Sequence, residues 1–499
     1  MNKNKIQIKR RRENSMKLSA KTGLIFLIIS ILISSALAYE NELFPGVNFF
    51  EDQYIKGYRQ PNIYDMSSNP AFFRTAYSEN LTVYQLSAQR QLNLYSRYFD
   101  PQSKDDIGLD LEWIKQLSRN STLAAGVKYY RSFHNEVNRS LEKNYYDHYF
   151  ALTDTTMGDI EYQGPQLSVL YNHELADQFL LGLEINYGVE RGLKDIYTEC
   201  ETILRNIDLK AGIGYKSADE QTYTGISARY FNRQGKYEAV KEYEDAFVKT
   251  WFGYHLYFPE NPRSTNRKDD DREGYRLGVQ FERKNILNTG LGIRLSGDFG
   301  AQKNTTKVGR PTFTQPRGYW EREGYDLTGN IYYHKNGIHG QLFFNQCDYY
   351  DWASPKTYDV LVLENDQQVN RIGSLINVEV FQPLELDAGF EIRSINTDYT
   401  EYVADFQYNE TRNENFLLLG AAYNLNTISS VNIRGSYSSL EPDFHWEGID
   451  KINVMSLQAG YGRQFVFGKL DLNFIYQLSD LDNAEDNIEQ FGISIMYRK

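Results

Sequence analysis

Apolar and polar residues alternate in twos along much of the chain, and residues 274–300 show the pattern most clearly. The apolar positions are Tyr275, Leu277, Val279, Phe281, then, after a polar break at 283–288, Leu291, Ile293, Leu295 and Phe299. The positions between them are polar, charged or small. A period of two is that of a β-strand, whose successive side chains point to opposite faces. The stretch therefore predicts an antiparallel hairpin with one apolar and one charged face.

The same unit recurs from Leu81 to the end of the chain and gives about eighteen predicted strands. Their connections alternate between short and long. The short connection Lys335-Asn336-Gly337 has the Asn-Gly signature of a tight hairpin. The long ones are predicted at 133–164, 234–272, 303–323, 352–369 and 397–413. Short periplasmic turns, long outer loops and an even strand number are typical of bacterial outer-membrane barrels. Residues 81–499 are thus predicted to form an all-β fold, a transmembrane antiparallel up-and-down β-barrel.

Two other fold classes are disfavoured. A soluble β-sandwich or propeller would also alternate, but its loops would not sort into two length classes, and a helical fold does not produce a period of two. The mean hydropathy of −0.59 does not exclude a membrane protein, because a barrel carries apolar residues only at every second position. The 40 tyrosines fit a membrane interface, and tyrosine is also a good strand former.

The first 38 residues are predicted to be a secretory signal peptide and not part of the fold. Residues 3–12 are basic, residues 24–32 are apolar, and Ala36 and Ala38 form a small-x-small cleavage site. Translation could begin at Met1 or at Met16. This segment carries a net charge of +7, so its removal takes the chain from −12 to −19. Such an acidic chain argues against a nucleic-acid partner. The predicted location is the outer membrane of a Gram-negative bacterium, in contact with outer-membrane lipid.

Residues 39–80 do not alternate and are rich in aromatic residues. These are Phe44, Phe49, Phe50, Phe72 and Phe73. Disordered segments are usually poor in aromatic residues. We therefore expect residues 39–80 to form a periplasmic plug that enters the barrel mouth and packs on small lumen residues. A flexible tail and a docking arm for a periplasmic partner are the alternatives.

Residues opposite the apolar face are predicted to line the lumen. The charged candidates are Asp110, Glu112, Glu184, Asp208, Lys210, Arg229, Arg276, Glu282, Arg294, Asp298, Glu379, Arg393, Arg434 and Asp471. Both signs occur, so these residues could form structural ion pairs across strands or a selectivity filter. The same faces carry glycines, among them Gly182, Gly212, Gly214 and Gly278, which would let another segment approach closely.

No catalytic or metal-binding pattern stands out. The seven histidines are scattered over separate strands and loops, and no Ser-His-Asp set can be assembled. The acidic run 269–271, predicted to lie in a loop, lacks the ligand spacing of a calcium site. Cys200 and Cys347 show neither a disulfide-scaffold nor a zinc-site pattern. The sequence predicts no enzyme, no metal and no cofactor.

Two motifs support resemblances to known barrels. Gln490, Gly492, Ile495 and Tyr497 resemble the C-terminal signal read by the barrel assembly machinery, although Arg498 and Lys499 follow the last aromatic residue. Asn69-Pro70-Ala71 is similar to a motif that precedes the first strand of long-chain fatty-acid transporters. The overall layout and residues 204–212 resemble an uncharacterised family of Bacteroidota outer-membrane β-barrel proteins. These features imply a channel or passive transporter for an unknown small solute. The alternative is a non-conducting accessory barrel that binds a partner protein at the cell surface.

Overall fold

The computed structural model describes residues 63–76, 80–92, 97–143, 145–147, 149–194, 199–239, 248–260, 267–310, 312–356, 360–381, 383–446, 448–484 and 487–499. The predicted signal peptide 1–38, with Ala36 and Ala38, and residues 39–62 of the predicted plug lie outside this part of the chain. The helical elements are α3 (Ile63–Ser67), η1 (Pro70–Phe72), α4 (Phe73–Ala76) and η2 (Tyr145–Asp147). No helix in the described ranges is long and apolar enough to cross a membrane.

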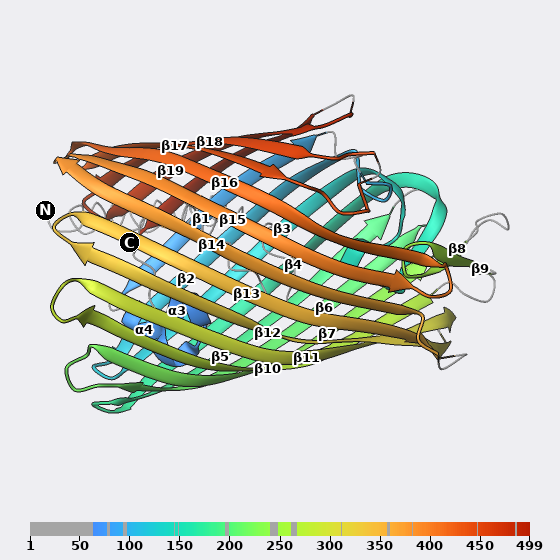
Figure 1. Ribbon diagram of the computed structural model, residues 1–499, viewed down its shortest axis with the longest axis horizontal. Helices are drawn as coiled ribbons and strands as arrows, with labels where there is room; N and C mark the ends of the chain where they lie inside the picture. The colour runs from blue at the N-terminus through green and yellow to red at the C-terminus, as the bar shows by residue number, and fades with distance from the viewer. Residues whose placement is uncertain are drawn as a thin grey trace, which may run out of the picture.

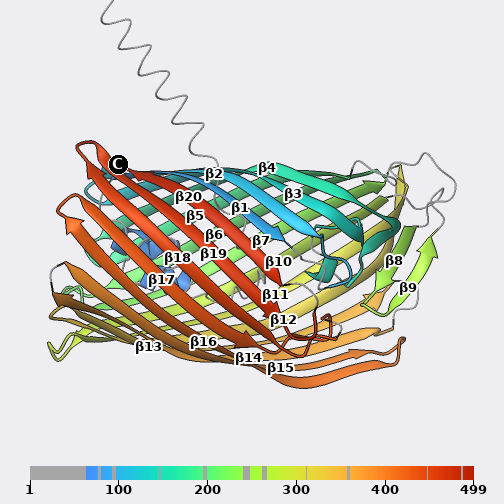
Figure 2. The ribbon, with the colours of Figure 1, turned by 90° about the horizontal axis from the view of Figure 1, so that it is seen from above.

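The strands form one antiparallel sheet that closes into a barrel (Figures 1 and 2). The first ten are β1 (Leu81–Leu92), β2 (Ser103–Ser118), β3 (Ser121–Ser140), β4 (Leu152–Ala176), β5 (Phe179–Lys194), β6 (Cys200–Lys216), β7 (Thr222–Ala239), β8 (Val248–Phe252), β9 (Leu256–Glu260) and β10 (Arg267–Ile286). The others are β11 (Leu291–Arg310), β12 (Phe313–Lys335), β13 (Ile338–Pro355), β14 (Leu363–Phe381), β15 (Leu384–Glu401), β16 (Phe406–Asn426), β17 (Ser429–Leu440), β18 (Ile452–Phe465), β19 (Gly468–Leu481) and β20 (Ile488–Arg498).

The barrel wall contains eighteen of these strands, as predicted. Each wall strand pairs with its neighbours in the chain, and β1 closes the ring by pairing with β20 from Val83↔Arg498 to Leu92↔Glu489. Strands β8 and β9 do not join the wall, because β7 pairs directly with β10. They form a separate hairpin that contacts the end of β4 through Leu152↔Thr250. Figures 1 and 2 place this hairpin at the end of the barrel opposite the C-terminus.

The outer surface of the wall carries a belt of exposed apolar side chains. On β10, Tyr275, Leu277 and Val279 are 60%, 59% and 54% exposed, whereas Gln280 and Glu282 on the opposite face are buried. Strands β10 and β11 form the predicted antiparallel hairpin, with Leu277 opposite Phe299. A large exposed apolar surface is unfavourable in water and favourable in lipid. The alternation in the sequence thus marks the two faces of the wall.

The tight turn at Asn336-Gly337 is also confirmed. Strand β12 ends at Lys335 and β13 begins at Ile338, so the turn has two residues. Their φ values are +56° and +74°, as in a type I′ hairpin turn. Glycine meets this left-handed requirement without steric strain.

The long predicted connections are wrong in extent, because the strands continue into them. Strand β3 runs to Ser140 and β4 starts at Leu152, inside the stretch 133–164, and β11 and β12 reach Arg310 and Phe313, inside 303–323. The same holds at the other long connections. The acidic run 269–271 lies in β10, where Asp269 pairs with Arg267 and Asp270 with Lys268. Outside lipid both faces of a strand can be polar, so hydropathy stops alternating while backbone pairing continues.

Closure of the sheet predicts resistance to detergent unfolding. A closed ladder has no free edge at which SDS could begin to separate strands. We expect an unheated sample to migrate faster in SDS electrophoresis than a boiled sample of the same preparation. Equal mobility before and after boiling would contradict a stable closed barrel.

Candidate functional site

Residues 63–76 lie inside the barrel at the end where the C-terminus is found (Figure 1). Helix α3 contacts β10 and β11, and η1 contacts β4, β5 and β6. Ile63, Ala71 and Phe72 are at most 1% exposed and pack with Leu180 and Tyr223 of the lumen wall. We call residues 63–76 the floor segment.

Asn69 fixes the floor segment to the wall. Its side-chain Oδ1 accepts the backbone N–H of Ala71 at 2.9 Å, which caps η1. Its Nδ2 donates to Gln280 Oε1 at 2.7 Å and to the backbone oxygen of Ile226 at 3.1 Å. From the other side, Asn172 Nδ2 donates to the backbone oxygens of Pro70 and Ala71 at 2.9 and 2.6 Å. The Asn-Pro-Ala turn is thus hydrogen-bonded to three wall strands.

Glycines in the wall make room for this turn. A Cβ atom on Gly212 would lie 1.8 Å from Asn69 Oδ1, and one on Gly182 would lie 2.0 Å from the carbonyl carbon of Pro70. A Cβ atom on Gly214 or Gly225 would lie 2.7 or 2.6 Å from the Phe72 ring. Each distance is too short for a real side chain, so only glycine allows this approach.

Most of the charged residues predicted for the lumen lie in ion pairs between wall strands. The pairs are Glu184–Lys210 at 3.3 Å, Asp208–Arg229 at 2.6 Å, Arg276–Asp298 at 3.1 Å, Glu282–Arg294 at 2.6 Å, Arg393–Glu414 at 2.9 Å, Arg434–Asp387 at 2.9 Å, and Asp471–Arg498. Asp110 lies opposite Lys128 in the β2–β3 register, whereas Glu112 and Glu379 are exposed. This arrangement fits the interpretation as a structural ion-pair wall better than a selectivity filter.

The four residues of the predicted assembly signal lie on the closing strand β20. Gln490 accepts a hydrogen bond from Gln91 of β1 at 2.9 Å, and Tyr497 packs beside Tyr84 with ring centroids 6.0 Å apart. Gly492 and Ile495 lie opposite Gln89 and Leu86 of β1. Recognition of this strand by the assembly machinery stays a prediction.

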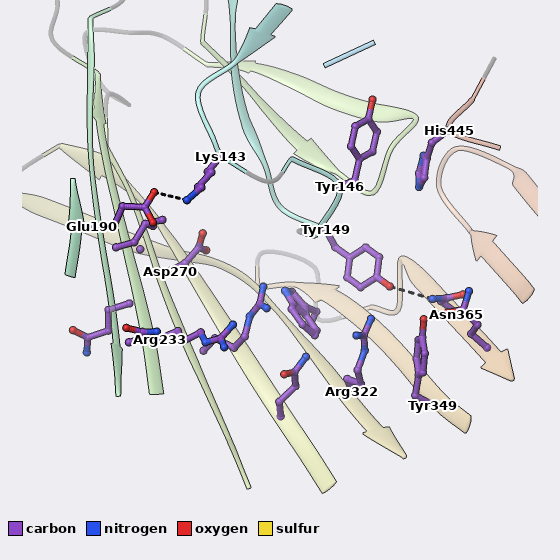
Figure 3. Close-up of a pocket in the computed structure, with 18 of the residues that line it drawn as sticks. Lys143, Tyr146, Tyr149, Glu190, Arg233, Asp270, Arg322, Tyr349, Asn365 and His445 are labelled. Carbon is purple, nitrogen blue, oxygen red and sulfur yellow. Dashed lines mark hydrogen bonds and ion pairs between the residues drawn. The ribbon is translucent and has the colours of Figure 1, made fainter. Parts of the chain in front are cut away.

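A cavity of about 420 Å³ lies in a part of the barrel where residues 63–76 contribute nothing to the lining, and Figure 3 shows some of the residues that line it. We call it the outer cavity. Eight of its lining residues are Arg or Lys and four are Asp or Glu. The basic residues come from several strands and loops: Arg97, Lys143, Arg205, Arg233, Arg272, Arg322, Arg393 and Arg412. Lys143 Nζ donates to Glu190 Oε1 at 2.7 Å and lies 4.7 Å from the Tyr130 ring centre.

Aromatic side chains form a second part of the lining. Trp320 is 2% exposed, and its ring lies edge-on to Tyr149 at 5.6 Å. The Arg322 guanidinium stacks on Tyr349 at 4.3 Å and binds both carboxylate oxygens of Asp351, one of them at 2.7 Å. Tyr149 donates to the same carboxylate at 2.6 Å. These contacts hold the rings and the guanidinium in fixed positions facing the cavity.

Three connections contribute side chains to the lining of the outer cavity, among them Tyr146, Tyr254 and His445. We call residues 145–147, 149–150, 253–255 and 443–446 the roof. Tyr254 donates through its hydroxyl to the backbone oxygen of Tyr146 at 2.7 Å. His445 lies 4.2 Å from the Tyr254 ring and 4.9 Å from the Tyr146 ring. Glu401 of β15 accepts the backbone N–H groups of Tyr254 and His255 at 2.7 and 3.1 Å.

Sequence reasoning missed the outer cavity almost completely. Of the predicted lumen residues only Arg393 lines it. Many of the other lining residues, such as Lys143, Arg272 and Trp320, lie in stretches that the sequence predicted to be loops. A usable signal was present, since Tyr145, Tyr146, Tyr149 and Phe150 crowd one polar stretch. Four aromatic side chains within six residues are unusual in a solvated loop and indicate a packed segment.

Comparison with known families gives one match. A model described as a family of unknown function (DUF6850) matches residues 70–495. No curated protein matches the sequence significantly.

Comparison with solved structures gives low similarities to outer-membrane barrels. The alcaligin outer-membrane receptor FauA from Bordetella pertussis has 7% identity and a TM-score of 0.45, covering 84% of this chain and 76% of that chain. The ferric preacinetobactin receptor BauA from Acinetobacter baumannii has 8% identity and a TM-score of 0.40, covering 84% and 80%. The monoaromatic hydrocarbon channel CymD has 13% identity and a TM-score of 0.33, covering 88% and 92%. Likenesses at this level carry no argument about what this chain binds.

The close approach of the floor segment to the wall glycines predicts that Gly212→Val detaches this segment from the wall. The new side chain would occupy the position of Asn69 Oδ1, and such overpacking costs about 1–3 kcal/mol. We expect hydrogen exchange in residues 63–76 to rise by about tenfold or more. Gly340→Val is the matched control, because a Cβ atom there meets nothing within 4 Å. Unchanged exchange in the Gly212 variant would contradict this account of the wall.

The position of His445 predicts a roof that loosens in acid. The pKa of His445 is lowered from 6.5 to about 4, chiefly by burial; Asp443 opposes this shift and Arg97 contributes to it. A depressed pKa means that the closed roof is most stable above pH 6.5 and is weakened as the pH falls towards 4. We expect hydrogen exchange in the peptide that contains His445 to increase over this range.

The matched variant for this test is His445→Phe. It keeps a ring between Tyr146 and Tyr254 but cannot take up a proton. Its roof should show a flatter pH profile between pH 6.5 and 4. Identical profiles for both proteins would rule out His445 as the titrating group.

Proposed function

The protein belongs to the DUF6850 family of unknown function, and we propose that it is an outer-membrane barrel that passes a small polar solute through its lumen. The observation that carries this proposal is the outer cavity. It is a polar cavity of about 420 Å³ that is lined by residues of the wall and of the roof. A barrel that served only as a scaffold would have no need of such a chamber.

The outer-membrane location is supported by the wall surface. Exposed Leu, Ile, Val, Phe and Tyr side chains occur on strands all round the barrel. The charged residues of the same strands lie on the opposite face, where they form ion pairs. Such a surface is suited to a bilayer and would aggregate in water.

The width of the barrel supports passage of a solute. Eighteen strands enclose a lumen wide enough for water and small solutes unless something fills it. Here the floor segment occupies one half and the roof covers the other. Both are parts of the chain that lie outside the wall ladder. They can therefore move without breaking the barrel, which is the usual arrangement of a gate.

We propose that the floor segment narrows the periplasmic mouth. It contacts the wall through hydrogen bonds of Asn69 and Asn172, through the Arg74–Glu174 ion pair, and through buried apolar side chains such as Phe72 and Phe73. The periplasmic end is assigned by the short turns and the C-terminus, which lie at that end.

Single-channel recording tests this proposal. The full-length barrel and a variant lacking residues 39–76 are reconstituted in planar bilayers. Loss of the floor segment should raise the conductance, because the narrowest part of the periplasmic half is gone. The heat-dependent shift in SDS electrophoresis serves as the control for assembly, which we expect to be intact because β20 is unchanged.

Two results would count against the proposal. Equal conductance of both proteins would mean that the floor segment does not restrict the lumen. Silence of both, with no entry of small sugars or amino acids into liposomes, would favour the accessory barrel that binds a partner protein.

A further inference from the structure

The lining of the outer cavity contains buried polar atoms that have no hydrogen-bond partner among the described residues. The donors are Trp320 Nε1, Arg393 Nε and Arg412 Nε, and the acceptors are Gln302 Oε1 and Asn365 Oδ1. Leaving such a group unpaired in a buried site costs about 1–3 kcal/mol. Both kinds of group are present, so a matching ligand must accept and donate hydrogen bonds. Hydroxyl groups do both.

The charge of the lining favours an anion. Its basic residues outnumber its acidic ones by eight to four. Two further carboxylates, Asp100 and Asp351, pair with Arg97 and Arg322 from outside the lining and compensate two of these charges. Basic residues still outnumber acidic ones around the cavity, although the net charge of the whole chain is −12. One carboxylate or sulfate group on a ligand would offset much of it, with bidentate geometry available from arginine.

The aromatic lining favours a ligand with flat, weakly polar faces. Tyr130, Tyr149, Tyr237, Trp320 and Tyr349 all line the cavity. The Arg322 guanidinium lies over the Tyr349 ring at 4.3 Å and that of Arg272 over the Trp320 ring at 4.8 Å, so each of these rings is paired with a guanidinium group. A pyranose ring presents C–H groups on its faces and hydroxyl groups at its edge. It can therefore lie against a tyrosine or tryptophan while its edge meets the arginines.

We propose that the outer cavity binds a small acidic carbohydrate, a sugar of one or two rings that carries a carboxylate or sulfate group. The volume of about 420 Å³ falls in the range of sites for small organic ligands. A purely apolar solute would leave the buried donors unpaired. An inorganic anion would leave the aromatic faces unused. This inference rests on the proposed function, since it names the solute class of the same lumen.

Calorimetry with the detergent-solubilised full-length barrel tests the ligand class. The acidic probes are glucuronate, digalacturonate and a sulfated disaccharide. The neutral probes are glucose and lactose, and the non-sugar anions are sulfate and citrate. We expect an acidic sugar to bind at least about tenfold more tightly than its neutral counterpart and than either simple anion, as expected for one charge-assisted hydrogen bond.

Each other outcome overturns a stated part of the inference. Equal binding of neutral and acidic sugars would contradict the role given to the excess of Arg and Lys residues in the lining. Equal binding of sulfate or citrate removes the role of the aromatic faces. Absence of binding across the whole panel rejects the carbohydrate class. The carboxylated and sulfated probes distinguish the two acidic groups.

Two variants connect binding to the cavity. Trp320→Phe keeps the ring and deletes the unpaired Nε1 donor, and Arg412→Gln removes one charge from the wall. Each should weaken binding of the best acidic sugar by about tenfold. Arg191→Gln is the matched control, because Arg191 pairs with Glu201 outside the cavity and its side chain is 66% exposed. Intact heat-dependent mobility shows that each variant is folded. Full affinity in both cavity variants would place the binding elsewhere.

Liposome uptake of the same sugars separates this inference from the proposed function. Binding with uptake supports both. Binding without uptake retains the ligand class and rejects transport. Uptake without saturable binding in the cavity retains transport and rejects the ligand class.

Discussion

The structure depends on one requirement, that no backbone N–H or C=O group may face lipid without a hydrogen-bond partner. The wall meets it by pairing its last strand with its first. Thr82 and Lys499 exchange both backbone hydrogen bonds at this seam, at 2.8 and 2.9 Å. Closure uses up both edges of the sheet, so every segment that is not a wall strand has to lie at one end of the barrel or inside it. The floor segment, the β8–β9 hairpin and the roof all occupy such positions.

Closure also creates an interior that must be filled or neutralised. Ion pairs such as Asp208–Arg229 and Arg434–Asp387 join neighbouring strands and let charged side chains lie inside without isolated charges. Where β5, β6 and β7 carry glycines instead, the wall is thin enough to accept Pro70 and Phe72. The residue type on the inner face therefore decides how a region of the lumen is filled. Charged residues form ion pairs between strands, and glycines leave space for another segment.

The periodicity of the sequence was sufficient to predict the wall. Positions such as Tyr275 and Leu277 show their outward direction by hydropathy alone, and the Asn336-Gly337 turn follows from backbone sterics. The ends of the strands could not be predicted, because above the membrane both faces meet polar surroundings. The aromatic residues Tyr145, Tyr146 and Tyr149 pointed to a packed segment, but the long-range contacts inside the barrel were beyond prediction for a different reason. Tyr149 meets Asp351 across 202 residues, and Asn69 meets Gln280 across 211. No local pattern encodes a contact between segments so far apart.

The separation of floor and roof constrains how the lumen could open. Strand β10 carries Gln280 at the floor and Arg272 at the outer cavity, both on its inner face. Eight residues of strand span about 26 Å. Strand β10 is hydrogen-bonded to β7 and β11 along this length and cannot slide independently of them. A local change at one site is therefore poorly transmitted to the other. The roof is different, because Tyr146 and Tyr149 belong both to the roof and to the cavity lining. A ligand in the cavity would touch the roof directly but not the floor segment. If the barrel passes a solute as proposed, the two closures are separate barriers, and a solute that opens the outer one by its own contacts would still need a second event to pass the inner one.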